Sequence, residues 1–233
     1  MSSASTPVRT RGPYRTGLRR REQILDAASA VFAEYGYAGG SVRTIAERVG
    51  VSPASLLQHF GTKEGLLMAV LENWDRRTVA ARLTDVTGLD YFRRLPEVMG
   101  AHLANRGLLE LFSTIAAEAS SPSHPAREFI QQRYTDNLAT LATHLREAIE
   151  AGEIAAFTPA EIDQEVRLVT AVLDGIGLQW LLDPATDVSA TVETYINRTV
   201  AAWRSGRQDL RLTPTSKGDA GSGQRSGRDG RAP

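Results

Sequence analysis

Residues 41–63 read Ser-Val-Arg-Thr-Ile-Ala-Glu-Arg-Val-Gly-Val-Ser-Pro-Ala-Ser-Leu-Leu-Gln-His-Phe-Gly-Thr-Lys, and this stretch decides the fold. It predicts two short helices joined by a tight turn. Ser41 can N-cap the first helix, and Gly50 can end it, because glycine adopts the left-handed conformation without a Cβ clash. Ser52 can cap the second helix, and Pro53 stands at its first position, where a missing amide costs nothing.

Apolar residues four apart give each of these helices a face to bury. Ile45 and Val49 share one face of the first helix, and Leu56 and Phe60 share one face of the second. Ala46 is small enough for the two helices to cross closely. This pattern predicts a helix–turn–helix, in which the second helix enters the major groove of DNA with its N-terminal residues nearest the bases.

The outward-facing residues suit contacts with DNA. Ser55 and Gln58 can hydrogen-bond base edges, glutamine matching adenine in a bidentate way, and Ala54 is short enough to touch a thymine methyl. Phosphate contacts, which set register rather than base preference, are expected from the first helix and from both ends of the second. The predicted DNA-binding set is therefore Ser41, Arg43, Thr44, Ser52, Ala54, Ser55, Gln58, His59, Thr62 and Lys63.

Helix pairs of this kind also occur in proteins that never bind DNA, so the flanking sequence matters. Residues 19–35 form a third predicted helix with apolar residues at helical spacing, ending at Gly36. Residues 1–18 are rich in arginine and broken by glycine and proline. They are predicted to be a flexible basic arm that enters a minor groove or lies along phosphates. The alternative is a disordered, solvated terminus.

Residues 19–71 closely resemble the DNA-binding domain of tetracycline-repressor (TetR) family transcriptional regulators. The resemblance is carried by residues 24–28, 32–37 and 41–67, and the ending His-Phe-Gly-Thr-Lys-Glu-Gly-Leu-Leu at 59–67 is its most specific part. The family usually has tyrosine where this chain has Leu57, so the polar DNA contact often made there is not carried over.

The resemblance implies an all-α fold of about nine helices. An N-terminal three-helix DNA-binding domain would precede a larger helical domain for ligand binding and dimerisation. The implied function is a sequence-specific transcriptional regulator, most commonly a repressor, which binds double-stranded DNA and is released by a small-molecule effector. No cofactor is implied.

Composition narrows the class further. The chain has 233 residues and no cysteine, so disulfide and thiolate chemistry are excluded. The sequence shows no stretch of about 20 apolar residues and no apolar leader. We therefore expect neither membrane insertion nor secretion, and we expect a cytoplasmic location. The net charge of zero hides a division, because residues 1–63 carry a net +5, residues 64–203 a net −9 and residues 204–233 a net +4. The basic part is the one that would meet DNA.

The rest of the chain is predicted to be helical. The predicted helices are 62–83, 89–105, 107–120, 124–151, 159–182 and 188–203, and the first of them would link the two domains. The predicted boundaries are therefore an arm at 1–18, a DNA-binding domain at 19–63, a regulatory domain at 64–204 and a disordered tail at 205–233. The helix at 159–182 is apolar on more than one face. Together with the helix at 188–203 it predicts a homodimer with two-fold symmetry and an approximately palindromic operator.

A ligand site can be suggested only from position and residue type. Pockets favour apolar and aromatic walls with a few polar groups, and ordinary core packing is the commoner role of such side chains. The candidates are Trp74, Phe92, Met99, His102, Phe112, Tyr134 and Gln179. A metal site has little support, because cysteine is absent and no histidines are closely paired.

Two other function classes are weighed against DNA binding. An enzyme is not expected, because the sequence has no Gly-x-Ser-x-Gly elbow, no Walker-type loop and no Rossmann fingerprint after a strand. Gly175-Ile-Gly177 lies within an apolar helix and reads as close helix packing. A helical protein-interaction module on the same fold, without DNA binding, is the second alternative, and the basic arm and Lys63 argue against it.

Overall fold

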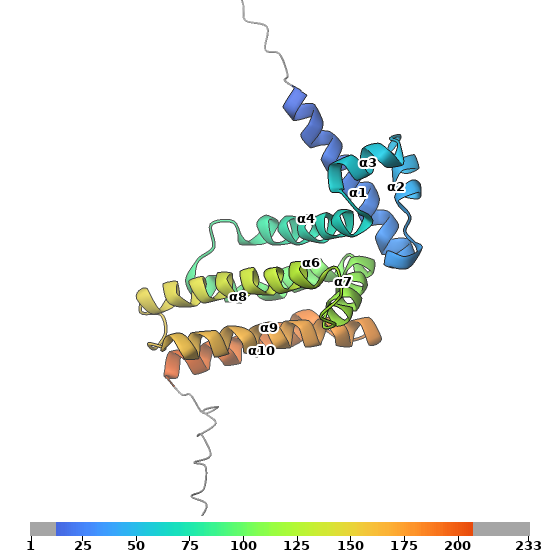
Figure 1. Cartoon of the computed structure of the whole chain (residues 1–233). Helices are drawn as coiled ribbons and strands as arrows, with labels where there is room; N and C mark the ends of the chain where they lie inside the picture. The colour runs from blue at the N-terminus through green and yellow to red at the C-terminus, as the bar shows by residue number, and fades with distance from the viewer. Residues whose placement is uncertain (1–12, 207–233) are drawn as a thin grey trace, which may run out of the picture.

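The computed structural model describes residues 13–206, which are helical throughout apart from short connections (Figure 1). No strand occurs within this described range, and the predicted all-α class is confirmed. The helices are α1 Pro13–Gly39, α2 Val42–Val49, α3 Pro53–Phe60, α4 Lys63–Leu83, α5 Gly88–Arg93, α6 Leu95–Leu103, α7 Arg106–Glu118, α8 Arg127–Glu150, α9 Pro159–Leu182 and α10 Val188–Ser205. The rest of the predicted arm, residues 1–12, and the tail from residue 207 lie outside the described residues.

Helix α1 begins at Pro13, whereas the sequence predicts its start at Arg19 and an arm up to residue 18. Proline is accepted in a first turn because its missing amide has no helical partner there, and arginine and leucine are favourable inside helices. The N-terminal turns of α1 project past α2 and α3 (Figure 1). Backbone that is not helical at Gly36 (φ 66°, ψ −179°) breaks α1 at the glycine predicted to end it.

The segment predicted as one helix at 89–105 is divided into α5 and α6 at Arg94. Pro96 has no amide to donate to the carbonyl four residues earlier, and its ring crowds that carbonyl, so a continuous helix cannot pass through. The Arg94 amide bonds to the carbonyls of Asp90, Tyr91 and Phe92 instead, which tightens the last turn of α5. This division brings the helices of the described range to ten, against about nine expected.

Two clusters of buried side chains hold the helices together. The N-terminal core joins α1, α2 and α3 to the first half of α4, to α7 and to the start of α8. Its fully buried members include Ile24, Phe32, Ile45, Leu56, Leu66, Leu71 and Leu108. The C-terminal core joins the end of α4 to α5, α6, α8, α9 and α10, with Leu89, Phe92, Leu141, Leu145, Val169 and Val192 among its buried members. Helix α4 therefore contributes to both cores.

The N-terminal helices sit at one end of a layered bundle (Figure 1). Helix α4 packs on α6, α8 packs on α9, and α9 packs on α10, so the long helices run side by side across the layers. Helix α7 lies across the end of the bundle nearest α1, and it contacts α1, α6 and α9. The DNA-binding helices are thus connected to the bundle through both α4 and α7.

The contact between α1 and α7 is unusually close at Gly107. A Cβ atom placed on Gly107 would lie 2.3 Å from the carbonyl oxygen and 2.7 Å from the Cα atom of Ala33. Only glycine allows backbone to approach backbone at this distance. The sequence prediction assigned the connection between the domains to α4 alone and did not include this second contact.

The turn between α2 and α3 leads to a first testable prediction. Gly50 has φ 67° and ψ 43°, its amide donates to the carbonyls of Ala46 and Glu47, and a Cβ placed on it would have nothing within 4 Å. Gly50→Ala should therefore lower the free energy of unfolding by about 1 kcal/mol through backbone strain alone. Gly50→Asn should cost less, because asparagine tolerates the left-handed conformation. Urea denaturation of both variants measures this, and an alanine variant as stable as the parent would contradict it.

Candidate nucleic-acid interface

The helix–turn–helix is fixed by three hydroxyl caps in a row. Ser41 Oγ accepts from the Thr44 amide at 3.0 Å, Ser52 Oγ accepts from the Ser55 amide at 3.1 Å, and Thr62 Oγ1 accepts from the Gly65 amide at 3.0 Å. Each cap satisfies one of the free amides at the start of its helix. The caps therefore set where α2, α3 and α4 begin, and with that the angle at which α3 leaves the turn.

The outer face of α3 is open to solvent. Leu56 is fully buried and anchors the inner face, while Ala54, Gln58 and His59 are exposed and Ser55 is half-buried. Ala54, Ser55 and Gln58, which are predicted to contact the bases, thus lie together on one accessible surface of α3. Phe60 is only partly buried, although it packs against the N-terminal core as expected. Leu57 is 36 % exposed on the same helix, so an apolar side chain stands near the polar ones.

The predicted phosphate contacts of α2 lie together at its N-terminus. Ser41, Arg43 and Thr44 are all exposed, and the hydroxyls of Ser41 and Thr44 are 2.8 Å apart. Arg43 pairs with Glu47 at 2.9 Å, but its side chain is 83 % exposed, so the guanidinium can be shared with a phosphate at little cost. The N-terminus of a helix adds free amides and a partial positive charge, both of which favour a phosphate.

Lys63 is held at the start of α4 by an aromatic contact that the sequence prediction missed. Its Nζ atom lies 4.4 Å from the centroid of the Tyr37 ring, and the Tyr37 hydroxyl donates a hydrogen bond to Glu64. Burial and this hydrogen bond raise the pKa of Tyr37, and the same bond lowers the pKa of the Glu64 carboxyl. Glu64 therefore stays ionised and Tyr37 stays neutral, a pairing that fixes the ring under Lys63.

Two arginines of α1 contact the helix–turn–helix. Arg20 donates to the carbonyl of Gly50 at 3.2 Å, and the Arg21 guanidinium lies 5.4 Å from the centroid of the Phe60 ring. Both residues lie in the first turn of the helix predicted at 19–35, and neither was predicted from the sequence to make a contact. Their contacts are visible only in three dimensions, because they join residues 30 or more positions apart.

The seven predicted ligand-site residues are spread over both cores and the surface. Phe92 and Met99 are buried in the C-terminal core, where Phe92 packs edge-on against Trp203 at 4.9 Å between ring centroids. Phe112 and Tyr134 pack against the N-terminal core, and Gln179 is exposed on α9. Position and residue type suggested these residues, and most of their side chains lie in different parts of the molecule.

Trp74 and His102 do come together, beside a half-buried charged cluster. Their rings meet edge-on at 4.9 Å between centroids, Asp75 pairs with Arg133 at 2.9 Å, and His102 Nε2 lies 3.4 Å from Asp75 Oδ1. Burial raises the pKa of Asp75, whereas its contacts with His102 and Arg133 lower it, and the net shift is downward. The cluster thus keeps the half-buried Asp75 carboxylate charged, next to the indole of Trp74.

Within residues 13–206, no group of three or more His, Cys, Asp or Glu side chains is arranged to hold a metal ion. No helix in this range combines the length and the apolar character that crossing a membrane requires.

The fold and the exposed α3 face define a helix–turn–helix DNA-binding protein, and comparison with known proteins identifies its family. Residues 24–70 match the family model described as "Bacterial regulatory proteins, tetR family", and residues 100–202 match the model of the "BetI-type transcriptional repressor, C-terminal" domain. The two matches cover both the DNA-binding helices and most of the bundle.

Individual relatives agree with this assignment. The chain is 31 % identical to the transcriptional repressor KstR2 of Rhodococcus jostii over 63 % of this chain and 72 % of that protein. It is 30 % identical to the repressor AcnR of Corynebacterium efficiens over 76 % of this chain and 93 % of that protein. A crystal structure of a TetR-family regulator from Rhodococcus sp. shares the fold, with a TM-score of 0.67, 23 % identity and coverage of 78 % and 99 %.

The chain belongs to the TetR family and is a DNA-binding transcriptional regulator. Members of this family are transcriptional regulators rather than enzymes. The resemblance stated from the sequence, the fold class and the general function are confirmed. The individual DNA-contacting and ligand-contacting residues and the domain boundaries stay predictions.

Proposed function

We propose that this protein is a repressor that binds an approximately palindromic operator as a homodimer and leaves it when a small molecule binds. DNA binding is supported above all by the outer face of α3, which is open to solvent. Hydroxyl caps at the starts of α3 and α4 fix the position of this helix. The relatives KstR2 and AcnR are named as repressors, which favours repression over activation. As a regulator of bacterial DNA, the protein would act in the cytoplasm, and no catalytic activity is proposed.

Dimerisation is supported by the uncovered face of α9. Leu168, Ala171, Gly175, Leu178 and Leu182 follow one another at spacings of three and four residues, which places them on one stripe of the helix. Leu168 is 40 % exposed, Leu178 is 53 % exposed and Leu182 is 80 % exposed. A Cβ placed on Gly175 would have nothing within 4 Å, so a second helix could approach closely there.

Helix α10 extends this surface. A shallow hollow between α9 and α10 is lined by small and polar side chains together with Val172, Tyr195 and Arg198. Two copies of such a helix pair would form a four-helix interface with two-fold symmetry. The two α3 helices of the dimer should then lie about 34–36 Å apart, which is one turn of duplex DNA, so that they enter successive major grooves.

Selection of bound sequences from random DNA is the most direct test. The proposal requires an enriched site with two related half-sites whose centres are about one helical turn apart. Binding to that site should fall steeply as salt rises, because phosphate contacts release counterions. Failure to enrich any sequence would instead favour a helical interaction module without DNA binding.

Two substitutions in the interface should act differently. Gln58→Ala is expected to relax base preference at one position of each half-site, at a cost of about 1–3 kcal/mol for the preferred base. Lys63→Ala is expected to weaken binding to all sequences and to reduce the salt dependence, because a phosphate contact carries no base information. Both are measured by titrating a set of single-base variants of the selected site. Unchanged base preference in Gln58→Ala would mean that another surface reads the bases.

A further inference from the structure

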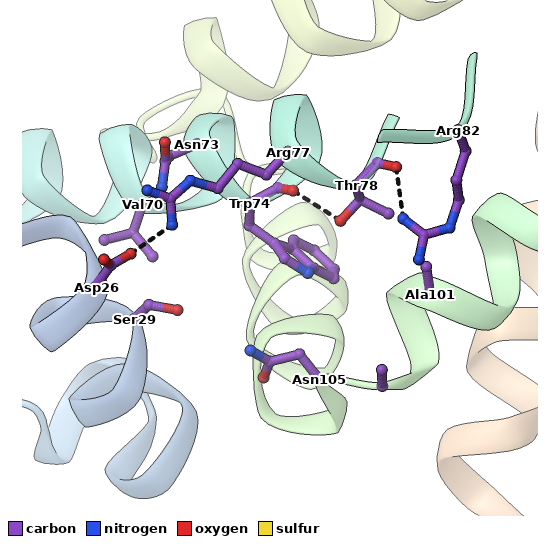
Figure 2. Close-up of a pocket in the computed structure, with 11 residues that line it drawn as sticks. Asp26, Ser29, Val70, Asn73, Trp74, Arg77, Thr78, Arg82, Ala101 and Asn105 are labelled. Atoms are coloured by element: carbon purple, nitrogen blue, oxygen red, sulfur yellow. Dashed lines mark hydrogen bonds and ion pairs between the residues drawn. The ribbon is translucent and has the colours of Figure 1, made fainter. Parts of the chain in front are cut away.

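An open cleft of about 330 Å³ lies between α1, α4 and the turn from α6 to α7, where the DNA-binding helices meet the bundle (Figure 2). Its volume is at the lower end of the range for sites that bind small molecules. Its walls come from α1 through Asp26 and Ser29, from α4 through Trp74 and Arg82, and from the α6–α7 turn through Asn105. Of the residues suggested from the sequence as ligand contacts, only Trp74 lines it.

Of the two arginines that line the cleft, one pairs with a carboxylate and the other, in the part of the chain that the structure describes, does not. Arg77 pairs with Asp26 across the cleft at 2.6 Å, which joins α4 to α1 (Figure 2). Arg82 donates to the carbonyl of Thr78 at 3.1 Å, a neutral group that leaves its positive charge uncompensated. Within residues 13–206, no ion pair joins Arg82 to a carboxylate. The lining therefore carries two guanidinium groups against one carboxylate, and it favours an anion.

The middle of the cleft is apolar on one side. The indole of Trp74 points into the space between α1 and the α6–α7 turn, and Arg77 and Arg82 stand on either side of it along α4 (Figure 2). The rear of this indole is fixed by its edge-on contact with His102. Asn105 caps α7 by accepting from the Leu108 amide at 3.3 Å, so the partly positive start of that helix also borders the cleft.

We propose that this cleft is an effector site for a small organic anion. The carboxylate of the ligand binds Arg82 and competes with Asp26 for the positive charge of Arg77, while its apolar body lies against Trp74. This inference rests on the proposed function, in which a small molecule controls DNA binding. Because Asp26 belongs to α1 and Arg77 to α4, occupancy of the cleft loosens the connection between the DNA-binding helices and the bundle.

Binding can be tested without DNA. The full chain is titrated with cyclohexanecarboxylate, which does not absorb where indole is excited, and its neutral amide serves as the control ligand. We expect a saturable change in tryptophan fluorescence, with a dissociation constant of about 1 mM for so small a ligand. The amide should produce no such change, and Trp74→Phe should remove the signal although Trp180 and Trp203 remain. The absence of saturable binding up to about 20 mM carboxylate overturns the proposal.

Two variants should shift the affinity for the carboxylate in opposite directions. Arg82→Gln should weaken binding about tenfold or more, because it removes the charge that the carboxylate meets. Asp26→Asn should tighten binding several-fold, because it removes a competing carboxylate and frees Arg77. Arg146→Gln, which removes an exposed arginine of α8, should leave the affinity unchanged. Calorimetry gives all three values, and equal weakening by Arg82→Gln and Arg146→Gln would show only a general charge effect, which would contradict the site.

The link to DNA is tested separately. Cyclohexanecarboxylate should reduce affinity for the selected operator in the parent protein, and the reduction should be smaller in Asp26→Asn, where the ion pair is already absent. Carboxylate binding without any change in DNA affinity overturns the effector role of the cleft. Failure of the ligand-free protein to bind DNA would instead contradict the proposed function, so the two failures are distinguishable.

Discussion

Gly107→Ala is expected to lower the free energy of unfolding by at least about 3 kcal/mol, at the upper end of the cost of overpacking. The added methyl would lie 2.3 Å from the carbonyl oxygen of Ala33, so a backbone must move before the variant can fold. Moving α7 away from α1 would also open the N-terminal core around Leu108, Leu111 and Ile115. Thermal denaturation should show a fall in the midpoint of about 10 °C for a chain of this size.

Gly100→Ala is the matched control for this prediction. Gly100 lies in α6, and a Cβ placed there would have nothing within 4 Å. Alanine is favoured over glycine inside a helix, so this variant should be more stable by about 0.5–1 kcal/mol. A second control is the double variant Gly107→Ala with Ala33→Gly, which should not recover stability because the clash is with backbone atoms. A Gly107→Ala protein as stable as the parent would mean that α7 does not pack against α1 at this distance.

The close contact at Gly107 matters for regulation as well as for stability. A change in the bundle can reach the DNA-binding helices through α4, whose side chains belong to both cores. It can also reach them through α7, which touches α1 directly. The cleft with Arg77 and Asp26 lies between these two connections. A ligand bound there, as proposed above, would act where α1 is held from two sides, and a displacement of α1 would then change the orientation of the helix–turn–helix.

The parts of this molecule that could be predicted from sequence depend on local chemistry. Ser41, Gly50, Ser52 and Pro53 each determine a helix end through their own side chain or backbone, and the structure places those ends where the sequence predicted them. The break at Pro96 had an equally local signal, which the prediction of one helix at 89–105 did not use. The family resemblance then supplied the general function.

The parts that could not be predicted depend on distance in space. Gly107 looks like any glycine near a helix start until α1 is known to lie against it. The cleft takes its side chains from three separate segments, so no spacing along the chain brings Asp26 of α1 or Asn105 of the α6–α7 turn next to Trp74 and Arg82 of α4. Aromatic type alone is weak evidence for a ligand contact, because most buried aromatic side chains fill cores. Phe92, for example, is fully buried and packs against Trp203.

Leu178→Glu is expected to convert the protein to a monomer and to lower its affinity for the full operator by about 100-fold or more. Leu178 is 53 % exposed at the centre of the uncovered stripe of α9, and two-fold symmetry would place two such charges close together in the interface. DNA affinity should fall because, in a dimer, binding of one α3 helix places the second at a high effective concentration near its half-site. Separate monomers lack this advantage. Sedimentation velocity measures the first effect, and titration of operator DNA measures the second.

The control for Leu178→Glu adds the same charge to another exposed helix face. Ala139→Glu lies on α8, outside the α9–α10 surface, and should leave both the dimer and DNA binding intact. Single half-sites provide a further check, because Leu178→Glu should bind one half-site about as well as the parent if its own helix–turn–helix is undamaged. A dimer that survives Leu178→Glu would place the two-fold axis elsewhere, and the spacing of the two α3 helices would then have to be derived from another face of the bundle. Loss of half-site binding would show that the substitution damaged the monomer, since α3 and α9 share no core.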